Sequence, residues 1–425
     1  MFCIRDFAEK RIYCIHKSKS SDMPDKSKPT IALTGATGFL GSHLMASLLS
    51  NGYRVIVLGR STKDETLHER ISKLLGWFGI ENLFNQVSCV EADLSLANCG
   101  IENEQYSRLC LVADSVIHCA SDTSFSESKR EKVISTNIDC LEGILEFSMN
   151  ARVKFFYYIS TAFVAGICDN ICKENLPSAT SFTNVYEESK AGAEKIIARY
   201  CEKNSIHLSI IRPSIVYGDS RSGRSLKFNA LYFPIRSVLS IKNIYLNDLN
   251  NNGGKKSSKN GIYIDKEGYL FLPLKIYLPK KGSLNIIPVD YFVNACMKII
   301  ENASRGGIFH LTNNSPTKLE TIVKYNEQFM KIRGVEIIYG KSTDYLLRNP
   351  PEELFDRLIE PYRPYLSDNR IFDRTNTDLV TDNLTPPEFT YEIYRNCMDY
   401  AIGVNWGTLI FAKENQKTKN VEMLF

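Results

Sequence analysis

The sequence predicts an α/β fold in which a doubly wound parallel sheet carries a smaller C-terminal domain. Two observations support this prediction. Short, continuous apolar segments alternate with segments of helical periodicity through most of residues 29–312, a pattern typical of a parallel sheet with helices on both faces. A glycine-rich turn also lies between the first apolar segment and the first helical segment, which is where such sheets bind phosphate groups.

The elements are expected in the following order. The second half of residues 1–28 is rich in Lys, Ser and Asp, so we expect a mobile N-terminal tail there. The first strand, around Ile31-Ala32-Leu33, leads through the glycine turn into a helix that runs to Leu49, and Asn51-Gly52 ends that helix. Further strands are expected at residues 54–58, 87–91, 115–118, 155–159, 208–212 and 308–311, and the helices between them include 132–149 and 187–203.

The alternation of strands and helices stops at residues 219–282. This region is rich in Ser, Asn, Gly, Lys and aromatic residues, and its low-complexity patch at 250–256 is expected to be a surface loop. Residues 313–425 have helical and loop-like patterns with two proline pairs. We therefore predict a sheet domain at residues 29–218, completed by about 283–312, and a substrate-binding domain formed by 219–282 and 313–425.

Composition excludes several classes of protein. The 425-residue chain is 44% hydrophobic and 24% charged, which is ordinary for a folded globular protein. A net charge of +4 is too small to indicate a dedicated nucleic-acid-binding protein. We find no apolar stretch of roughly 18 residues, so we expect no transmembrane segment. The 12 cysteines include no CxxC pair, and no histidine beside them has zinc-site spacing; this favours reduced thiols, no metal site and a cytoplasmic location.

The glycine-rich turn indicates a dinucleotide site. Gly35 allows the tight turn, Gly38 lets the backbone approach a pyrophosphate, and Gly41 permits close packing of helix on strand. The phosphates would lie at the helix N-terminus, where unpaired N–H groups attract anions. The sheet domain is therefore predicted to be of the Rossmann type. The expected cofactor contacts in this turn are Gly35, Thr37, Gly38, Phe39, Leu40 and Gly41.

The GxxGxxG spacing, followed by Phe39-Leu40-Gly41, resembles that of extended short-chain dehydrogenase/reductases. The resemblance implies further cofactor contacts after later strands, and it assigns a bracing role to the asparagine in Ser-Thr-Asn-Ile. The segment from Arg212 to Gly218 also closes its strand as in the extended enzymes. The additional residues implied at the cofactor are Asp93, Leu94, Ala120, Ser121, Asn137 and Pro213.

The end of the second strand predicts which cofactor is bound. An enzyme that prefers NAD usually has Asp or Glu there, to bind the ribose 2′-hydroxyl. This chain has Leu58-Gly59-Arg60-Ser61, in which the first charged side chain is Arg60. Because a guanidinium can grip and stack over an adenosine 2′-phosphate, we predict NADPH.

Tyr186 and Lys190 form a YxxxK pair at the start of a predicted helix. A spacing of four residues puts both side chains on one face. Tyr186 could donate a proton to a carbonyl oxygen, and a nearby lysine ammonium would lower its pKa from the usual value of about 10. In the family the lysine also binds the nicotinamide ribose, so both residues are expected at the cofactor.

The fifth strand ends in Ser160-Thr161, which resembles the family's Ser/Thr position, where a hydroxyl orients the substrate carbonyl. By alignment with the usual pair of hydroxyl residues, the second member is the catalytic one. We therefore predict Thr161, Tyr186 and Lys190 as the catalytic set.

Within the family, the chain resembles the thioester reductase and fatty acyl-CoA reductase branch, whose NAD-binding domains are called male-sterility-type. The segments that carry this resemblance are 160–166, 184–190, 218–223 and 286–293. It implies NADPH-dependent reduction of an acyl thioester, on coenzyme A or an acyl-carrier protein, to an aldehyde, and it leaves open whether a second step to an alcohol follows. Within the second domain, Arg221, Arg224 and Lys227 are candidates for a pantetheine phosphate, and the aromatic candidates for an acyl pocket are Tyr232, Phe233, Phe271 and Tyr277.

Two other functions remain open at this point. The same fold could serve an NAD(P)-dependent dehydrogenase or epimerase of a small hydroxyl or nucleotide-sugar substrate, although Arg60 argues against the epimerases, which usually retain NAD. A non-catalytic NADP-binding scaffold is a further alternative. The intact set of Thr161, Tyr186 and Lys190 argues against a scaffold, which has no need of it.

Overall fold

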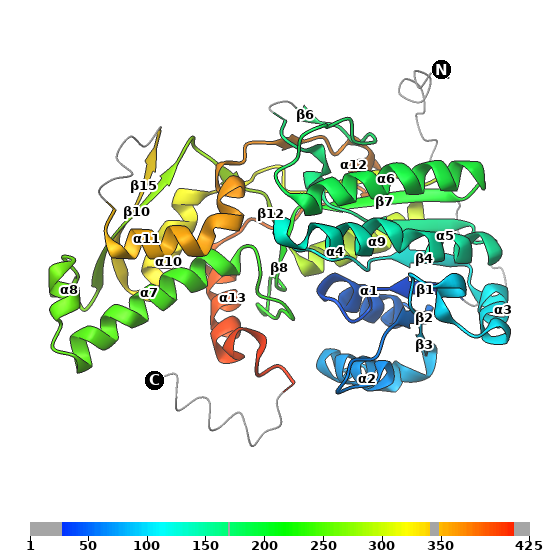
Figure 1. Cartoon of the computed structure of the whole chain (residues 1–425), viewed down its shortest axis with the longest axis horizontal. Coiled ribbons are helices and arrows are strands. Elements are labelled where there is room, and N and C mark those ends of the chain that lie inside the picture. Colours follow the sequence, from blue (N-terminus) through cyan, green and yellow to red (C-terminus); the bar gives the residue numbers. More distant parts are fainter. Residues whose placement is uncertain (1–27, 169–170, 341–347, 412–425) are drawn as a thin grey trace.

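The computed structural model describes residues 28–168, 171–340 and 348–411; of the predicted N-terminal tail, only Lys28 falls within it. Seven parallel strands form the main sheet in the order β13-β7-β5-β4-β1-β2-β3 (Figure 1). These strands are β1 Thr30–Thr34, β2 Arg54–Gly59, β3 Val87–Glu91, β4 Ser115–His118, β5 Phe155–Ile159, β7 His207–Pro213 and β13 Gly307–Leu311. The strand order reverses between β1 and β4, and a parallel sheet opens a crevice for ligands at such a point.

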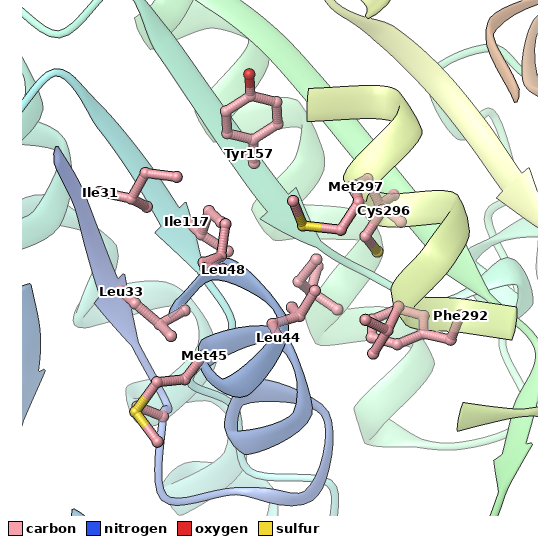
Figure 2. Packing of buried hydrophobic residues seen from close by; sticks show 14 of the residues in the cluster. Ile31, Leu33, Leu44, Met45, Leu48, Ile117, Tyr157, Phe292, Cys296 and Met297 are labelled. Carbon is pink, nitrogen blue, oxygen red and sulfur yellow. The ribbon is translucent and has the colours of Figure 1, made fainter. Parts of the chain in front are cut away.

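Helices cover both faces of this sheet, which confirms the doubly wound prediction. One face is covered by α1 (Phe39–Ser50), α2 (Leu67–Phe78) and α9 (Val289–Asn302), and the other by α3 (Asn103–Val112), α5 (Leu141–Asn150) and α6 (Val185–Lys203). Successive strand residues point to opposite faces, so Ile31 and Leu33 join the first core while Ala32 joins the second. Figure 2 shows the first core, to which α1 contributes Leu44 and α9 contributes Phe292.

The helix predicted at residues 132–149 is interrupted. The structure has α4 at Arg130–Ile134, a π-helical turn, η5, at Ser135–Asp139, and then α5. Such π turns interrupt the regular hydrogen bonding of an α-helix, and they occur frequently at functional sites. Asn137 lies in this turn and is buried.

The second half of the chain builds a separate lobe around its own core (Figure 1). Strands β15, β10 and β9 form a three-stranded sheet that packs with α7, α10, α11 and α13. The elements of this lobe are α7 Tyr232–Asn251, α8 Lys255–Lys259, β9 Tyr263–Ile264, β10 Leu270–Leu278, α10 Leu319–Met330, β15 Ile332–Tyr339, α11 Pro350–Ile359, η8 Glu360–Ser367, α13 Tyr391–Gly403 and η9 Asn405–Gly407.

The prediction of a surface loop at residues 250–256 was wrong in its secondary structure. The patch is largely exposed, but it contains the end of α7 and the start of α8, joined by a short turn. The reason is that Val238, Ile241 and Tyr245 bury one face of α7, and packing of that face extends the helix into a segment whose composition alone favours a loop.

Short elements connect the two lobes. Strand β8 pairs with β12, β11 with β14, and β6 with β16, while α12 packs against α9 and β13 of the sheet lobe. We propose that residues 219–282 and 313–425 form the second domain, with α12 as a segment that returns to the sheet.

The bounds of the remaining short elements are η2 Glu81–Gln86, η3 Ala97–Gly100, η4 Glu127–Lys129, η6 Ala162–Ala165, β6 Ile171–Cys172, β8 Ile215–Tyr217, β11 Ser283–Leu284, β12 Ile286–Pro288, β14 Thr317–Lys318, β16 Ile371–Phe372 and α12 Thr375–Thr381.

A buried ion pair joins α6 to the sheet. Arg212 of β7 donates from Nε and Nη2 to the two carboxylate oxygens of Glu194, at 2.9 and 2.6 Å, and the two side chains are 2% and 0% exposed. Arg212 also donates from Nη1 to Nε2 of His310, 3.1 Å away. Because Nδ1 of His310 faces the Asp373 carbonyl oxygen, which can only accept, the ring carries its proton on Nδ1. Burial lowers the pKa of His310 to about 3, so the ring is neutral.

We expect the Glu194→Ala variant to lose about 3–5 kcal/mol of unfolding free energy, because it leaves the Arg212 guanidinium buried without a counter-ion. Denaturant-induced unfolding at neutral pH measures this loss. Glu104→Ala is the matched control, since it removes an exposed i,i+4 ion pair with Arg108 and should cost less than about 0.5 kcal/mol. Similar small losses in both variants would contradict the importance of the buried pair.

Candidate active site

The crevice between β1 and β4 is walled by backbone. Gly35 has φ of 74°, and a Cβ there would lie 2.6 Å from the Ala120 nitrogen. At Gly41, a Cβ would lie 2.1 Å from the carbonyl oxygen of Gly35. Gly38 caps α1 without a side-chain acceptor. This cradle fits a dinucleotide pyrophosphate, because the phosphates could approach the N–H groups of the first turn of α1 directly.

Thr34 fixes the geometry of this crevice. Its hydroxyl oxygen accepts from the backbone N–H groups of Cys119 and Ala120, at 3.2 Å each, and it lies 2.9 Å from Nδ1 of His118. Since the hydroxyl already accepts two hydrogen bonds, its own proton points at Nδ1 of His118. Burial lowers the pKa of His118 to about 3, so the ring stays neutral and can accept. The ends of β1 and β4 are thereby held together.

Asn137 links this crevice to α6. Its side-chain NH₂ group donates to the Asp122 carbonyl oxygen and to Ser189 Oγ, each at 2.9 Å. Its Oδ1 accepts from the Asp122 N–H at 2.8 Å and from Ser121 Oγ at 3.0 Å. Ser189 in turn donates to the Tyr186 carbonyl oxygen at 2.8 Å. The asparagine thus uses its full hydrogen-bonding capacity to brace the loop after β4 against the helix that carries Tyr186.

Tyr186 lies in the first turn of α6, beside Thr161 at the end of β5. Burial raises the pKa of Tyr186 above its usual value, and a hydrogen bond with the Thr161 side chain opposes this rise. The neighbouring Ser160 instead donates to Glu194 at 2.6 Å, within the buried ion pair. Of the two hydroxyls, Thr161 is therefore the one beside Tyr186, and its catalytic role stays a prediction.

Lys190 lies one helical turn after Tyr186 and is buried. Its Nζ donates to the Ile159 carbonyl oxygen at 2.6 Å and lies 4.2 Å from the centre of the Tyr158 ring. Burial lowers the pKa of Lys190 to about 8, although Cys119 and Glu194 oppose the shift. The sequence-based expectation that the lysine lowers the pKa of Tyr186 is not met in this structure, where burial dominates and raises it.

One cavity of about 340 Å³ joins these groups to the second lobe. It brings together ten of the residues predicted from the sequence and leaves six outside its lining. The predicted residues that line it are Gly35, Gly38, Phe39, Leu40, Gly41, Ser121, Thr161, Tyr186, Lys190 and Pro213. The predicted residues outside the lining are Thr37, Arg60, Asp93, Leu94, Ala120 and Asn137, of which Ala120 abuts Gly35 and Asn137 braces the site as described.

Arg60 and Asp93 lie at the carboxyl ends of β2 and β3. The Arg60 guanidinium is 3.7 Å from the Asp93 carboxylate, and the Arg60 side chain is 71% exposed. Hydrogen bonds from Ser95 are the main cause of a lowered Asp93 pKa, and Arg60 adds to the effect. The pair lies on the β2 side of the glycine turn, where the adenosine ribose of a dinucleotide is expected in this fold.

The far part of the cavity is apolar and comes from the second lobe. Among the described residues that line the cavity, only Lys190 and Lys227 carry a charge. Phe125, Phe163, Tyr362 and Tyr365 line it between the two lobes. The apolar wall beyond them consists of Ile235, Val238, Ile276, Leu278, Leu284, Leu319, Ile322, Val323, Val335, Ile337 and Phe355.

Several candidates from the second domain do not reach the cavity. Tyr232, Phe233, Phe271 and Tyr277 are absent from its lining; Tyr232, for example, is buried and accepts a hydrogen bond from the Gly218 N–H at 2.9 Å. The same holds for two of the three basic candidates. Arg224 stacks over Trp77, 4.1 Å from the ring centre, and Arg221 lines a separate groove with Asp219. Lys227 does line the main cavity.

Sequence reasoning missed Phe125, Tyr362 and Tyr365, because no motif spacing connects them and they converge only through the fold. Glu194 was also missed, but it left a signal: it follows Tyr186 and Lys190 at the same four-residue spacing on α6.

Within the three described ranges, no group of three or more His, Cys, Asp or Glu side chains could hold a metal ion. No helix there is long and apolar enough to span a bilayer.

Comparisons with known proteins agree with this architecture. Residues 33–296 match the family described as male sterility protein. A nonribosomal peptide synthetase, asaC of Aspergillus flavus, is 24% identical over 84% of this chain and 35% of its own length. The large subunit of L-2-aminoadipate reductase from Candida glabrata is 27% identical over 64% of this chain and 21% of its own length. The chain therefore spans about a third or less of these two relatives.

Among solved structures, the terminal R domain from the myxalamid PKS-NRPS biosynthetic pathway has the same fold. Its TM-score to this chain is 0.70 at 20% identity, and the alignment covers 90% of this chain and 92% of that domain.

We expect the affinity for a nicotinamide cofactor to fall as the pH rises through about 8, the pKa to which burial lowers Lys190. A cofactor that uses the ammonium group favours the protonated lysine, so its Kd should be nearly constant below the pKa and rise by up to about tenfold per pH unit above it. Equilibrium titration of NADP⁺ or NADPH between about pH 7 and pH 9.5 measures this. Lys190→Arg keeps its charge throughout and should remove the inflection. A wild-type Kd that does not change with pH would exclude a role for this charge.

Proposed function

The chain belongs to the male sterility protein family, and we propose that it reduces an acyl thioester to an aldehyde with NADPH as the hydride donor. One observation carries this proposal. The glycine turn, Thr161, Tyr186 and Lys190 line the same cavity as an apolar wall from the second lobe. A nicotinamide site and a site for an acyl chain are thereby joined, with the candidate proton donor between them. The predicted cytoplasmic location stays a prediction.

The residues that would hold the cofactor are those of the crevice between β1 and β4. The turn from Gly35 to Gly41 would face the pyrophosphate, and Lys190 would face the nicotinamide ribose. Arg60 would bind the 2′-phosphate, exchanging its contact with Asp93 for a doubly charged partner. When bound, NADPH supplies the hydride that reduces the carbonyl carbon.

Tyr186 and Thr161 would act on the carbonyl oxygen. Both hydroxyls can donate to one oxygen, which stabilises the negative charge that develops there during reduction. Tyr186 then gives its proton to that oxygen. Burial raises the pKa of Tyr186, so the side chain is protonated at neutral pH but is a weaker acid than a free phenol. The charge of Lys190 would stabilise the phenolate that remains.

The product of this step is a hemithioacetal, whose collapse releases a thiol and an aldehyde. In the collapse the carbon–sulfur bond breaks, the hydroxyl proton returns to the Tyr186 phenolate, and the sulfur leaves as a thiolate that takes up a proton from solvent water. No covalent bond to the enzyme is needed. This agrees with the state of Cys119, which lines the cavity. Burial raises the pKa of its thiol to about 11, and a protonated thiol is a poor nucleophile. The same residues could reduce the aldehyde once more, to an alcohol.

The proposed substrate is an acyl group on coenzyme A or on an acyl-carrier protein. The apolar wall suits a hydrocarbon chain, since apolar surface removed from water contributes about 25 cal/mol per Å². Similarity to a nonribosomal peptide synthetase and to an aminoadipate reductase supports a carrier-bound thioester. Lys227, at the same cavity, is suitably placed to meet a phosphate on the incoming arm.

An alternative substrate is the ketone or alcohol of an apolar molecule. The apolar lining is compatible with such a compound, whereas a nucleotide sugar would bring two phosphates to a cavity in which Lys190 and Lys227 are the only cations among the described lining residues. The test is NADPH oxidation with a panel of acyl-CoA and acyl-carrier thioesters, with identification of products. Thioester-dependent formation of aldehyde supports the proposal. Turnover of free ketones or alcohols without consumption of any thioester would replace it by the dehydrogenase alternative.

We expect Tyr186→Phe to lower kcat by roughly 10² or more, because it removes a positioned acid, while the Kd for NADPH stays nearly unchanged. Steady-state kinetics and a separate cofactor titration check this. Tyr200→Phe is a matched control on the same helix, where the hydroxyl contacts Met149 Sδ outside the cavity, and it should retain full turnover. Near-wild-type kcat in Tyr186→Phe would refute the assignment of the proton donor.

We expect Arg60→Ala to raise the KM for NADPH by about tenfold or more, the scale of one lost charged hydrogen bond, and to change the KM for NADH much less. The reason is that only NADPH carries the 2′-phosphate. Arg54, exposed at the other end of β2, provides the control variant Arg54→Ala, which should leave both KM values unchanged. A wild-type enzyme that prefers NADH would overturn the assignment of NADPH.

A further inference from the structure

The first turn of α6, which carries Tyr186, is held by a residue from the second lobe. Asn184 is the N-cap of this helix and accepts from the Glu187 N–H at 3.1 Å. The Glu187 carboxylate accepts from the Thr183 N–H at 3.0 Å and from the Tyr365 hydroxyl at 2.6 Å. The Asn184 side-chain NH₂ group donates to that same hydroxyl at 2.7 Å. Tyr365 therefore joins both side chains that cap the helix, across more than 170 residues of sequence.

This junction is buried and contains a carboxyl group. Glu187 is 0% exposed and Tyr365 is 6% exposed. Burial raises the pKa of Glu187, while the hydrogen bond from Tyr365 and the nearby Arg370 lower it. Arg370 itself is paired with Asp368, with Nε 2.9 Å from Oδ1. A short hydrogen bond to a buried carboxylate is of the stronger, charge-assisted kind, and a buried carboxylate that loses a donor is costly.

The ring of Tyr365 lies against the same cavity as Tyr186. Its centre is 5.5 Å from that of Phe125 and 5.1 Å from that of Phe163, and all three residues line the cavity. Phe125 also packs on Tyr186, with ring centres 6.0 Å apart. Tyr365 thus contacts the cavity wall through its ring and the cap of the catalytic helix through its hydroxyl.

We propose that Tyr365 is a positioning residue: by holding Asn184 and Glu187, it sets the place of the Tyr186 hydroxyl, so that the second lobe completes the geometry of proton transfer. The inference rests on the proposed function, in which Tyr186 donates the proton. The physical reason is that the first turn of a helix lacks half of its backbone hydrogen bonds and follows its caps. Proton transfer is sensitive to such changes, since a displacement of about 1 Å can cost about 10²-fold in rate.

Tyr365→Phe tests the proposal, because it removes the hydroxyl and keeps the ring contacts. We expect kcat to fall about tenfold, with the KM for the thioester and the Kd for NADPH within about twofold of wild type. The solvent deuterium isotope effect on kcat should also rise, because proton transfer becomes slower relative to other steps. A variant that is merely less stable would contain less active enzyme but would have an unchanged isotope effect.

Tyr339→Phe is the matched control. The Tyr339 hydroxyl donates to Glu320 at 2.7 Å, so this variant loses the same kind of hydrogen bond in the same lobe, away from the cavity lining. Its kcat, KM and isotope effect should equal those of wild type. If Tyr365→Phe has the kcat and isotope effect of Tyr339→Phe, the positioning role is wrong.

Glu187→Gln gives a second measurement, which does not depend on the folding of Tyr365→Phe. The amide oxygen can still accept from Tyr365, but without a charge, and the NH₂ group then faces the Thr183 N–H that the carboxylate accepts in wild type. We expect kcat to fall by about two- to fivefold, with a rise in the isotope effect. In this background the further change Tyr365→Phe should cost less than it does in wild type, because the two side chains act together. Wild-type kinetics in Glu187→Gln, or fully additive losses, would refute the coupling.

The outcome for Tyr186→Phe separates the two proposals. If that variant turns over normally, the proposed function fails and the positioning role fails with it. If Tyr186→Phe is inactive while Tyr365→Phe matches its control, only the positioning role fails.

Discussion

The active site depends first on the buried ion pair between Glu194 and Arg212. Tyr186, Lys190 and Glu194 follow one another at four-residue spacing along α6, so they lie on one face of the helix. The ion pair of Glu194 with Arg212 lies on that face, one helical turn after Lys190. Arg212 donates hydrogen bonds to both carboxylate oxygens of Glu194. This contact holds α6 in one orientation about its own axis. Glu194 of this pair also accepts a hydrogen bond from the Ser160 hydroxyl. The same charged contact therefore ties α6 to the sheet and binds the Ser160 hydroxyl, while Thr161 is the hydroxyl beside Tyr186.

Two further sets of hydrogen bonds hold α6 in addition to the ion pair. From the sheet side, Asn137 in its π turn connects the loop after β4 to Ser189 of α6. From the side of the second lobe, Tyr365 reaches the cap of the same helix. Helix α6 is thus held at its N-cap, at Ser189 and at Glu194 by three different parts of the chain. Such over-determination is what a site needs if a proton donor must stay within a fraction of an ångström.

The cavity has one part walled by polar backbone and another part walled by apolar side chains. Near the glycine turn it is walled by backbone, because Cβ atoms at Gly35 and Gly41 would clash, and it offers N–H groups to an anion. In the second lobe it is walled by aliphatic side chains from α7, α10, β10 and β15. Phe125, Tyr362 and Tyr365 lie at the boundary between these parts, with ring centres 5.5–5.7 Å apart where Phe125 meets the two tyrosines. An anionic cofactor and an apolar chain can therefore meet at Tyr186.

The sequence alone determined the features that local chemistry fixes. The strands at 87–91, 115–118 and 155–159 have the predicted bounds because each is a short segment rich in β-branched or aromatic residues. The glycine turn and the Tyr186–Lys190 spacing follow from backbone and helix geometry. Only the tertiary structure decided the rest. The π turn at Asn137, the helix through residues 250–251 and the convergence of Phe125, Tyr362 and Tyr365 depend on packing between distant segments. The raised pKa of Tyr186 was missed for the same reason: burial is a property of the whole fold, and it outweighs the neighbouring charges that sequence spacing can suggest.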